Sequence, residues 1–447
     1  MEIVKEFARR IAEKIGMEVP SNWKSMDEIQ VARRFLDGIN RYLYQKKSEL
    51  GATEVNGEEF HYFSAFHKYW ESAHKDILNL RVSEEQTRIA AEALQQAVSI
   101  YGVRLLERPL PTLGLLPEQV AQVRFLTANQ DFRKPPENQF EKYLDDKEQF
   151  AAETVASDPA AYLNFMNFTK LSQTEKGLDF ARNAAGFLLK NNITAYEIAQ
   201  FCGNDAAKVR KILVTAENTD YGSKKANMFI RDMIAWRVWP DLNNIDAIDV
   251  ASDTNTMKIA LRARILVSEI PLLSSLLDIF CYQYEYVNEM AALAWRQVWK
   301  DWVALPGSHA PVSPCLMDFL IYRVGKDYCK DILVKYKCES GHDFYYFYAR
   351  KRICSICTEQ KKVQPEERLL PCQIPSSELP RKGGNLLLND KNLLFKFNGK
   401  CLFEDTCLPR SASFVKYEPP RSISIKGETG WTSAYAEEGV GGGGLMA

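Results

Sequence analysis

Residues 205–227 read DAAKVRKILVTAENTDYGSKKAN, and this stretch alternates between helical and turn-forming sequence. Its first part, Asp205 to Ala216, predicts a short helix because a capping aspartate is followed by apolar residues at helical spacing. A polar turn over 217–222 comes next. Ser223 then opens a second helical pattern that continues through Met233. The stretch therefore predicts two short helices joined by a tight turn.

A second informative stretch, residues 252–262, reads SDTNTMKIALR. Asp253 directly precedes an apolar, helix-competent segment, which is the position that an N-cap residue occupies. A further helix is therefore predicted to begin immediately after Asp253.

Together the two stretches resemble the helix-hairpin-helix superfamily of DNA glycosylases, which includes endonuclease III and 8-oxoguanine glycosylase. In that family a Gly-x-Lys-x-Ala-[Asn/Asp] segment opens the second hairpin helix, and here residues 222–227 read GSKKAN. The nucleophilic lysine of the family falls on Lys224. The family also has an aspartate that leads to Ile/Val-Ala-x-Arg, which matches residues 259–262, so its catalytic aspartate falls on Asp253.

The detailed match covers about residues 206–262 and departs from the family pattern at several points. The usual Leu-Pro-Gly-[Val/Ile]-Gly hairpin is replaced by a polar turn that retains only Gly222. The residue two positions after the aspartate is commonly His and is Asn255 here. The interval between Lys224 and Asp253 is longer than is common, and the Gly/Pro-rich approach to the aspartate is missing.

The resemblance and the helical periodicity predict a mostly α protein with a two-lobed, helix-hairpin-helix glycosylase-like core. We expect an N-terminal helical region over 1–110, the core over 111–335, a Cys-rich metal-binding and β-hairpin module over 336–417, and a disordered tail over 418–447. Individual predictions include a helix within 83–101, one or two long helices within 267–303, a helix over about 315–334, and a hairpin over 385–403.

The predicted pair has a physical rationale beside the resemblance. A lysine at a helix N-terminus faces the positive end of the helix dipole, and Lys225 adds a second positive charge nearby. The dipole and the Lys225 charge both favour the neutral, nucleophilic amine of Lys224. A carboxylate at Asp253 would stabilise the positive charge that develops on a departing sugar. The alternative is that Lys224 is a solvent-exposed helix residue and that Asp253 only caps a helix.

DNA-binding residues are predicted in two places. At the turn, Gly222, Ser223 and Lys225 would meet a phosphate at the exposed helix terminus. In the basic, aromatic segment 124–136, Asn129, Gln130 and Arg133 would line a base pocket or fill the space that a flipped base vacates. A plain capped loop is the alternative for this second segment.

The cysteines indicate a metal site, because six of the ten lie in the last quarter of a chain with no secretion signal. Two knuckles would supply two ligands each, as in a zinc ribbon. The predicted zinc ligands are Cys338, His342, Cys354 and Cys357. The alternative is a 4Fe-4S cluster held by Cys329, Cys338, Cys354 and Cys357, since residues 322–329 resemble the approach to the cluster of endonuclease III relatives.

Composition sets further limits. The net charge of −1 gives no global sign of nucleic-acid binding, although a local basic face is enough to neutralise a few phosphates. No apolar run approaches the length of about 20 residues that a membrane helix needs. We expect a cytoplasmic, monomeric protein with no membrane association.

The function predicted from these patterns is that of a DNA glycosylase. It would bind double-stranded DNA, flip a damaged or modified base and cleave its N-glycosidic bond, with AP-lyase activity through a lysine imine as a further possibility. Two alternatives remain open: a non-catalytic, zinc-containing nucleic-acid-binding protein, and an N-glycosidase that acts on RNA or nucleotides.

Overall fold

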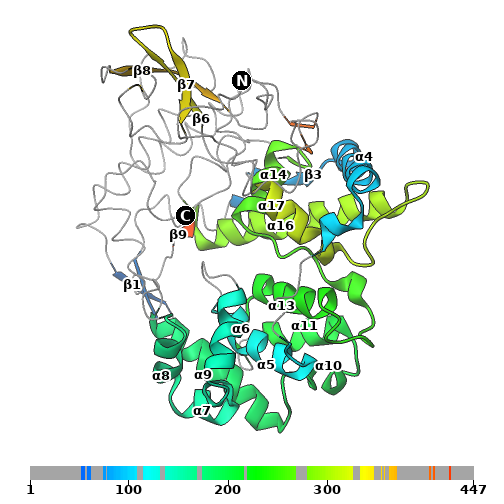
Figure 1. Cartoon of the computed structure of the whole chain (residues 1–447), viewed down its shortest axis with the longest axis vertical. Helices are drawn as coiled ribbons and strands as arrows, with labels where there is room; N and C mark the ends of the chain where they lie inside the picture. Colours follow the sequence, from blue (N-terminus) through cyan, green and yellow to red (C-terminus); the bar gives the residue numbers. More distant parts are fainter. Residues whose placement is uncertain are drawn as a thin grey trace. The chain divides into compact units, whose positions relative to one another are not determined.

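The computed structural model describes 14 ranges of the chain together with Cys354 and Cys357 (Figure 1). The ranges are 52–55, 58–61, 74–76, 78–107, 114–130, 136–168, 174–215, 219–267, 279–325, 333–346, 362–369, 402–403, 406–407 and 422–423. Arg133 and Cys329 lie outside these residues. So do the helices predicted before residue 51, nearly all of the hairpin predicted over 385–403, and nearly all of the tail.

The chain forms two compact units that are not consecutive segments. We call residues 103–253 and 309–320 the central unit, and residues 1–102, 254–308 and 321–446 the flanking unit. The core predicted over 111–335 is therefore shared between the two units, with a division directly after Asp253. Helix dominates the described residues, which confirms the mostly α prediction.

The central unit consists of helices, of which α9 is the longest among the described residues (Figure 1). They are η3 (Val103–Leu106), α5 (Pro117–Ala128), α6 (Pro136–Asp145), η4 (Glu148–Phe150), α7 (Ala152–Ser157), α8 (Pro159–Phe165), α9 (Thr174–Asn191), α10 (Ile198–Phe201), α11 (Ala206–Val214), α13 (Ser223–Ala235), η5 (Ile245–Ala247) and η6 (Pro314–Met317). Both α11 and α13 begin at the residues that the sequence predicts, and of the residues between them the structure describes Thr215 and 219–222.

Aromatic packing forms the centre of this unit. The Phe125 ring of α5 stacks on Tyr221 with ring centroids 5.7 Å apart, and Phe229 of α13 packs edge-on against Phe125 at 5.6 Å. All three side chains are buried. Because Tyr221 precedes α13 and Phe229 lies within it, the same cluster fixes both the end of the turn and the helix that follows.

The flanking unit combines two long helices with short strands. Its helices are α4 (Glu84–Tyr101), α14 (Thr254–Arg262), α16 (Cys281–Val303) and α17 (Asp318–Arg323), of which α17 begins in the central unit. Its strands are β1 (Ala52–Val55), β2 (Glu58–His61), β3 (Arg81–Val82), β4 (Leu266–Val267), β5 (Ile279–Phe280), β6 (Leu333–Cys338), β7 (Asp343–Tyr346), β8 (Val363–Leu369) and β9 (Ser422–Ile423).

These strands form four small sheets. β1 pairs with β2 and β3 pairs with β4, both antiparallel, whereas β5 and β9 are parallel. The largest sheet has the order β7-β6-β8 and is antiparallel throughout. It carries the predicted cysteine module, because β6 ends at Cys338 and pairs there with Val363 of β8.

The helix predicted over about 315–334 is confirmed over 318–325 and wrong at 333–334, which belong to a strand, while residues 326–332 lie outside the described part of the chain. The structure has a single turn at Pro314–Met317, then α17, which ends at Arg323. Strand β6 already begins at Leu333. The apolar pattern alone did not reveal this change, because β6 is stabilised by pairing with strands that come later in the chain.

Two other helix predictions are confirmed. The pattern over 83–101 forms α4, which buries Ala90, Leu94 and Ala97. The apolar region 267–303 contains one long helix, α16, which begins at Cys281. Among the described helices, none combines the length and apolar character that a membrane span requires.

Candidate functional site

The predicted metal ligands begin with a tight knuckle between β6 and β7. Cys338 closes β6 and His342 stands just before β7, so the antiparallel pair brings both to the same end of the sheet. The Cys338 N–H donates to the His342 carbonyl at 3.1 Å, and the Gly341 N–H donates to the Cys338 carbonyl at 2.8 Å. Gly341 has a φ of 80°, a left-handed conformation that glycine adopts at little cost.

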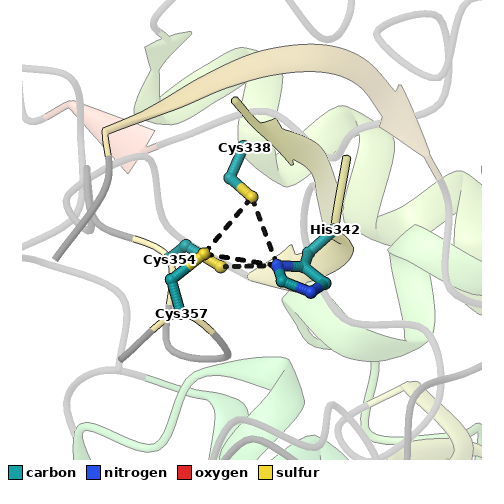
Figure 2. A group of neighbouring side chains, drawn as sticks. All are labelled: Cys338, His342, Cys354 and Cys357. Carbon is teal, nitrogen blue, oxygen red and sulfur yellow. Dashed lines mark hydrogen bonds between the residues drawn. The ribbon is translucent and has the colours of Figure 1, made fainter. Parts of the chain in front are cut away.

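The two remaining cysteines complete a compact group (Figure 2). The Nδ1 atom of His342 lies 3.4 Å from the Cys338 Sγ, 3.3 Å from the Cys357 Sγ and 3.9 Å from the Cys354 Sγ. The Cys338 and Cys357 sulfurs are 3.7 Å apart. All four ligand atoms lie within 4.8 Å of one another, so the group could hold a metal ion.

The environment of this group favours the thiolate form of Cys338. Burial raises the pKa of its thiol, but the backbone N–H groups of His342 and Ser340, together with side-chain hydrogen bonds of Cys357 and Cys354, outweigh that effect and lower the pKa to about 6. Burial raises the pKa of the Cys357 thiol. Backbone N–H groups that point at a sulfur are the kind of outer contact that holds a metal ligand in place.

Lys224 lies in the first turn of α13, next to an open helix terminus. Gly222 and Ser223 are exposed, while Lys224 and Lys225 are half-buried. No side chain caps this helix. In contrast, α4 and α11 are capped by Ser83 and Asp205, and α5 has a Gln119 side chain that accepts from the Leu116 N–H.

Several hydrogen bonds anchor the residues that directly precede α13. Buried Thr219 donates its hydroxyl to the Leu213 carbonyl at 2.7 Å, and the Tyr221 hydroxyl donates to the Phe125 carbonyl. Asp220, at a φ of 55°, accepts from the Asn183 amide of α9. The exposed backbone at the start of α13 is therefore fixed in position by the hydrogen bonds of the residues before it.

Gly222 itself has an ordinary extended backbone. Its φ of −72° and ψ of 159° are open to any residue, and a Cβ built on it would find nothing within 4 Å. The backbone conformation of this turn therefore does not require glycine. A close approach of a ligand and the preference for glycine at an N-cap are both compatible with glycine at this position.

Asp253 is half-buried and directly precedes α14, as predicted. The following turn is packed tightly, since the Trp295 indole N–H of α16 donates to the Thr256 carbonyl at 3.2 Å. Lys224 and Asp253 both fall in the central unit, each at the N-terminal end of a helix. Among the described residues, the Lys224 ammonium has no hydrogen-bond or ion-pair partner.

Asn129 and Gln130 are buried at the end of α5, and their amides contact α9. The Asn129 Nδ2 donates to the Phe180 carbonyl at 3.1 Å, and the Gln130 Nε2 donates to the Gly177 carbonyl at 2.6 Å. Gly177 is packed closely here, because an added Cβ would lie 3.1 Å from the Gln130 Oε1. In this structure the two side chains join helices, so a contact with DNA would require them to leave α9.

One polar contact between the hairpin helices was not predicted. The Arg210 Nε of α11 donates to the Asn227 Oδ1 of α13 at 2.8 Å, and Asn227 is only 4% exposed. The GSKKAN segment placed Asn227 in a motif but gave no indication of a partner. The basic Lys-Val-Arg pattern at 208–210 was the only available signal for Arg210.

No family model matches this chain, and no curated protein matches it either, so its function has to be inferred from the geometry above.

Proposed function

We propose that this protein is a DNA glycosylase of the helix-hairpin-helix type, with Lys224 as nucleophile and Asp253 as the stabilising carboxylate. The observation that carries the proposal is the first turn of α13, where two lysines adjoin an uncapped, exposed helix terminus. Cations at this end of a helix oppose its dipole by about 0.3–1 kcal/mol each, and a glycine N-cap costs roughly a few tenths of a kcal/mol relative to serine or aspartate. A sequence that keeps both unfavourable features in place is typical of a functional site.

The same terminus supports DNA binding. The backbone N–H groups of the first turn, at Ser223 and Lys224, and the dipole of a 13-residue helix favour a phosphate oxygen there. Lys208 and Lys211 of α11 are exposed on the helix that the Arg210–Asn227 hydrogen bond joins to α13. These lysines give the region a local positive charge, although the net charge of the whole chain is −1. A surface that binds phosphates needs such a local positive charge.

Asp253 would supply the negative charge that the reaction needs. Cleavage of an N-glycosidic bond builds positive charge on the sugar, and a fixed carboxylate stabilises that charge in the transition state. The Lys224 amine would attack the anomeric carbon as the base departs, and the resulting imine would open the way to β-elimination. The base has to be flipped out of the duplex first.

We propose zinc as the metal of the Cys338 group. Zinc bonds of about 2.3 Å to sulfur and about 2.0 Å to nitrogen in a tetrahedron place neighbouring ligand atoms about 3.5–3.8 Å apart. The observed separations of 3.3, 3.4, 3.7 and 3.9 Å agree with that geometry. A 4Fe-4S cluster contains eight atoms between its ligands and needs wider spacing, which favours a single ion. The zinc would tie the β6–β7 knuckle to Cys354 and Cys357 and would have a structural role.

The proposal is tested with duplex DNA that carries one abasic site, because this probe needs no knowledge of the excised base. Borohydride added during the reaction should trap a covalent protein–DNA adduct with the parent protein, and Lys224→Gln should abolish it. Lys190→Gln is the matched control, since Lys190 is an exposed lysine at the end of α9 and takes no part in the proposed site. An adduct of parental yield with Lys224→Gln would exclude Lys224 as the nucleophile.

The runner-up is a non-catalytic nucleic-acid-binding protein, and the metal group together with the exposed start of α13 favours it equally. This reading expects duplex binding with neither trapping nor base release. An N-glycosidase acting on RNA or nucleotides would instead release bases from single-stranded RNA or nucleotides while leaving duplex DNA intact.

A further inference from the structure

Four charged residues form a buried network around α13, and the proposed chemistry does not use any of them. We call Arg124, Arg231, Asp232 and Asp318 the α13 charge network; they are 0%, 7%, 0% and 3% exposed. They come from α5, α13 and the start of α17, all within the central unit. Two positive and two negative charges make the network neutral.

The contacts of the network are directional. The Arg124 Nη2 and Nε lie 2.8 and 3.1 Å from the Asp232 Oδ2. The Arg231 Nη2 and Nε lie 2.7 and 3.0 Å from the Asp232 Oδ1, and the Arg231 Nη1 pairs with Asp318. The Arg124 Nη1 also donates to the Gln139 Oε1 of α6 at 2.9 Å. Each guanidinium therefore holds one face of α13 to a different neighbouring element.

Stability alone does not explain such a network. Buried ion pairs lose much of their attraction to desolvation, and well-packed apolar residues in their place are often as stable or more stable. Apart from Asn227, which pairs with Arg210, the rest of the buried face of α13 is apolar, with Ala226, Phe229, Ile230 and Met233. Apolar packing is non-directional and tolerates small rotations and shifts of a helix. The network instead fixes one rotation and one axial position.

Lys224 lies on the same stripe of α13 as Arg231. Seven residues separate them, which is two turns with an offset of about 20°. A rotation of about 20° at a side-chain radius of about 5–6 Å would move a group on that stripe by about 2 Å. Misplacement of a reacting group by about 1 Å can cost about 10²-fold in rate. Asn227, one turn from Lys224, is held to α11 on this same side.

We propose that the α13 charge network positions Lys224, and that Arg231 and Asp318 are its positioning residues. The expected effect of the network on catalysis rests on the proposed role of Lys224 as the nucleophile. Its structural content, the orientation of the first turn of α13, does not depend on that role and can be measured separately.

The test replaces both partners of one pair at once, with Arg231→Met and Asp318→Leu in the full chain. This leaves Arg124 and Asp232 paired and the net charge unchanged. Because buried Asp232 keeps Arg124 but loses its two hydrogen bonds from Arg231, the thermal midpoint should fall moderately, while the rate of borohydride trapping on an abasic duplex should fall about tenfold or more. The control is the exposed pair Arg182 and Asp179 of α9, changed to Gln and Asn, which should leave both readouts as in the parent.

A second readout is independent of catalysis. Limited acylation with an amine-reactive reagent, followed by mass spectrometry, gives the ratio of Lys224 to Lys225 modification. This ratio should change at least about twofold in the double variant and stay constant in the α9 control. Asp318→Asn, which keeps the side-chain shape, should change it in the same direction and replaces the double variant should that one fail to fold.

The outcomes separate the two proposals. A parent protein that forms no adduct refutes the role of Lys224, while the labelling ratio still decides whether the network orients α13. A parental labelling ratio in folded Arg231/Asp318 and Asp318→Asn variants overturns the positioning proposal, whatever the trapping result. A changed ratio with parental trapping overturns its link to catalysis.

Discussion

Gly325 packs its backbone directly against Asn255, and this contact leaves no room for a side chain at residue 325. A Cβ there would lie 2.7 Å from the Asn255 carbonyl oxygen and 2.8 Å from the Asn255 Cβ. Asn255 is in the first turn of α14, two residues after Asp253, and Gly325 follows α17. The end of one helix thus rests on the start of another.

We expect Gly325→Ala to destabilise the protein by about 1–3 kcal/mol, because the backbone at Asn255 has to move to admit a methyl group. Urea unfolding measures this effect. Gly186→Ala is the matched control: it lies within α9, where a Cβ meets nothing within 4 Å, and should gain about 0.5–1 kcal/mol. Equal effects of the two substitutions would show that the close contact with Asn255 does not exist.

The Phe403–Trp295 contact predicts that the cysteine-bearing C-terminal part stabilises the flanking unit. Phe403 is 1% exposed and its ring lies 5.8 Å from that of Trp295, whose indole N–H reaches α14. Phe403→Ala should cost about 3–5 kcal/mol in urea unfolding, as expected for a buried aromatic. Leu402→Ala, at a half-buried neighbour, should cost clearly less. A smaller loss at Phe403 than at Leu402 would contradict this packing.

For the metal group, elemental analysis of purified protein should find one zinc per chain. Cys354→Ser should abolish it, because one thiolate of four is lost, and chelation should lower the thermal midpoint. Cys407→Ser is the control, since Cys407 is outside the group and should leave the zinc content unchanged. Iron with a brown chromophore would contradict the zinc assignment and support the cluster. Protein that contains neither zinc nor iron would exclude both assignments.

Gly222 allows a sharp test of the phosphate contact. Since its backbone is ordinary and a Cβ finds open space, Gly222→Ala should lower the free energy of unfolding only by what alanine costs at an N-cap, about 1 kcal/mol or less. A phosphate seated against this residue would be displaced, so duplex binding should weaken several-fold in fluorescence anisotropy at fixed salt. Parental affinity in Gly222→Ala would remove the proposed phosphate position.

Local patterns in the sequence predicted the features that depend on nearby residues. The spacing of Cys338, His342, Cys354 and Cys357 was sufficient because the knuckle needs only a five-residue turn and a glycine. The starts of α11 and α14 followed in the same way from Asp205 and Asp253.

Features that depend on distant residues were not predictable from one sequence. Arg124 and Asp232 are 108 positions apart, and Arg231 and Asp318 are 87 apart, so no local pattern pairs them. The end of α17 is set by its contact with Asn255 and by strand pairing of β6, and neither is visible in apolar periodicity. Burial of Asn129 and Gln130 likewise depends on α9, about 50 residues away.

The last prediction concerns Asp253, whose carboxylate should act on the transition state and not on binding. Asp253→Asn keeps the side-chain shape and removes the charge, so base excision should slow by about 10²-fold or more, as for loss of one preorganised stabiliser. Duplex affinity should stay level or rise, because a negative charge that repels phosphate is lost. Since an asparagine also caps a helix well, the thermal midpoint should change little, which separates the catalytic role from simple capping of α14. Single-turnover excision on a confirmed substrate measures the first effect and anisotropy the second. Normal excision by Asp253→Asn would leave the residue as a helix cap, and normal excision by both Asp253→Asn and Lys224→Gln would remove the catalytic pair.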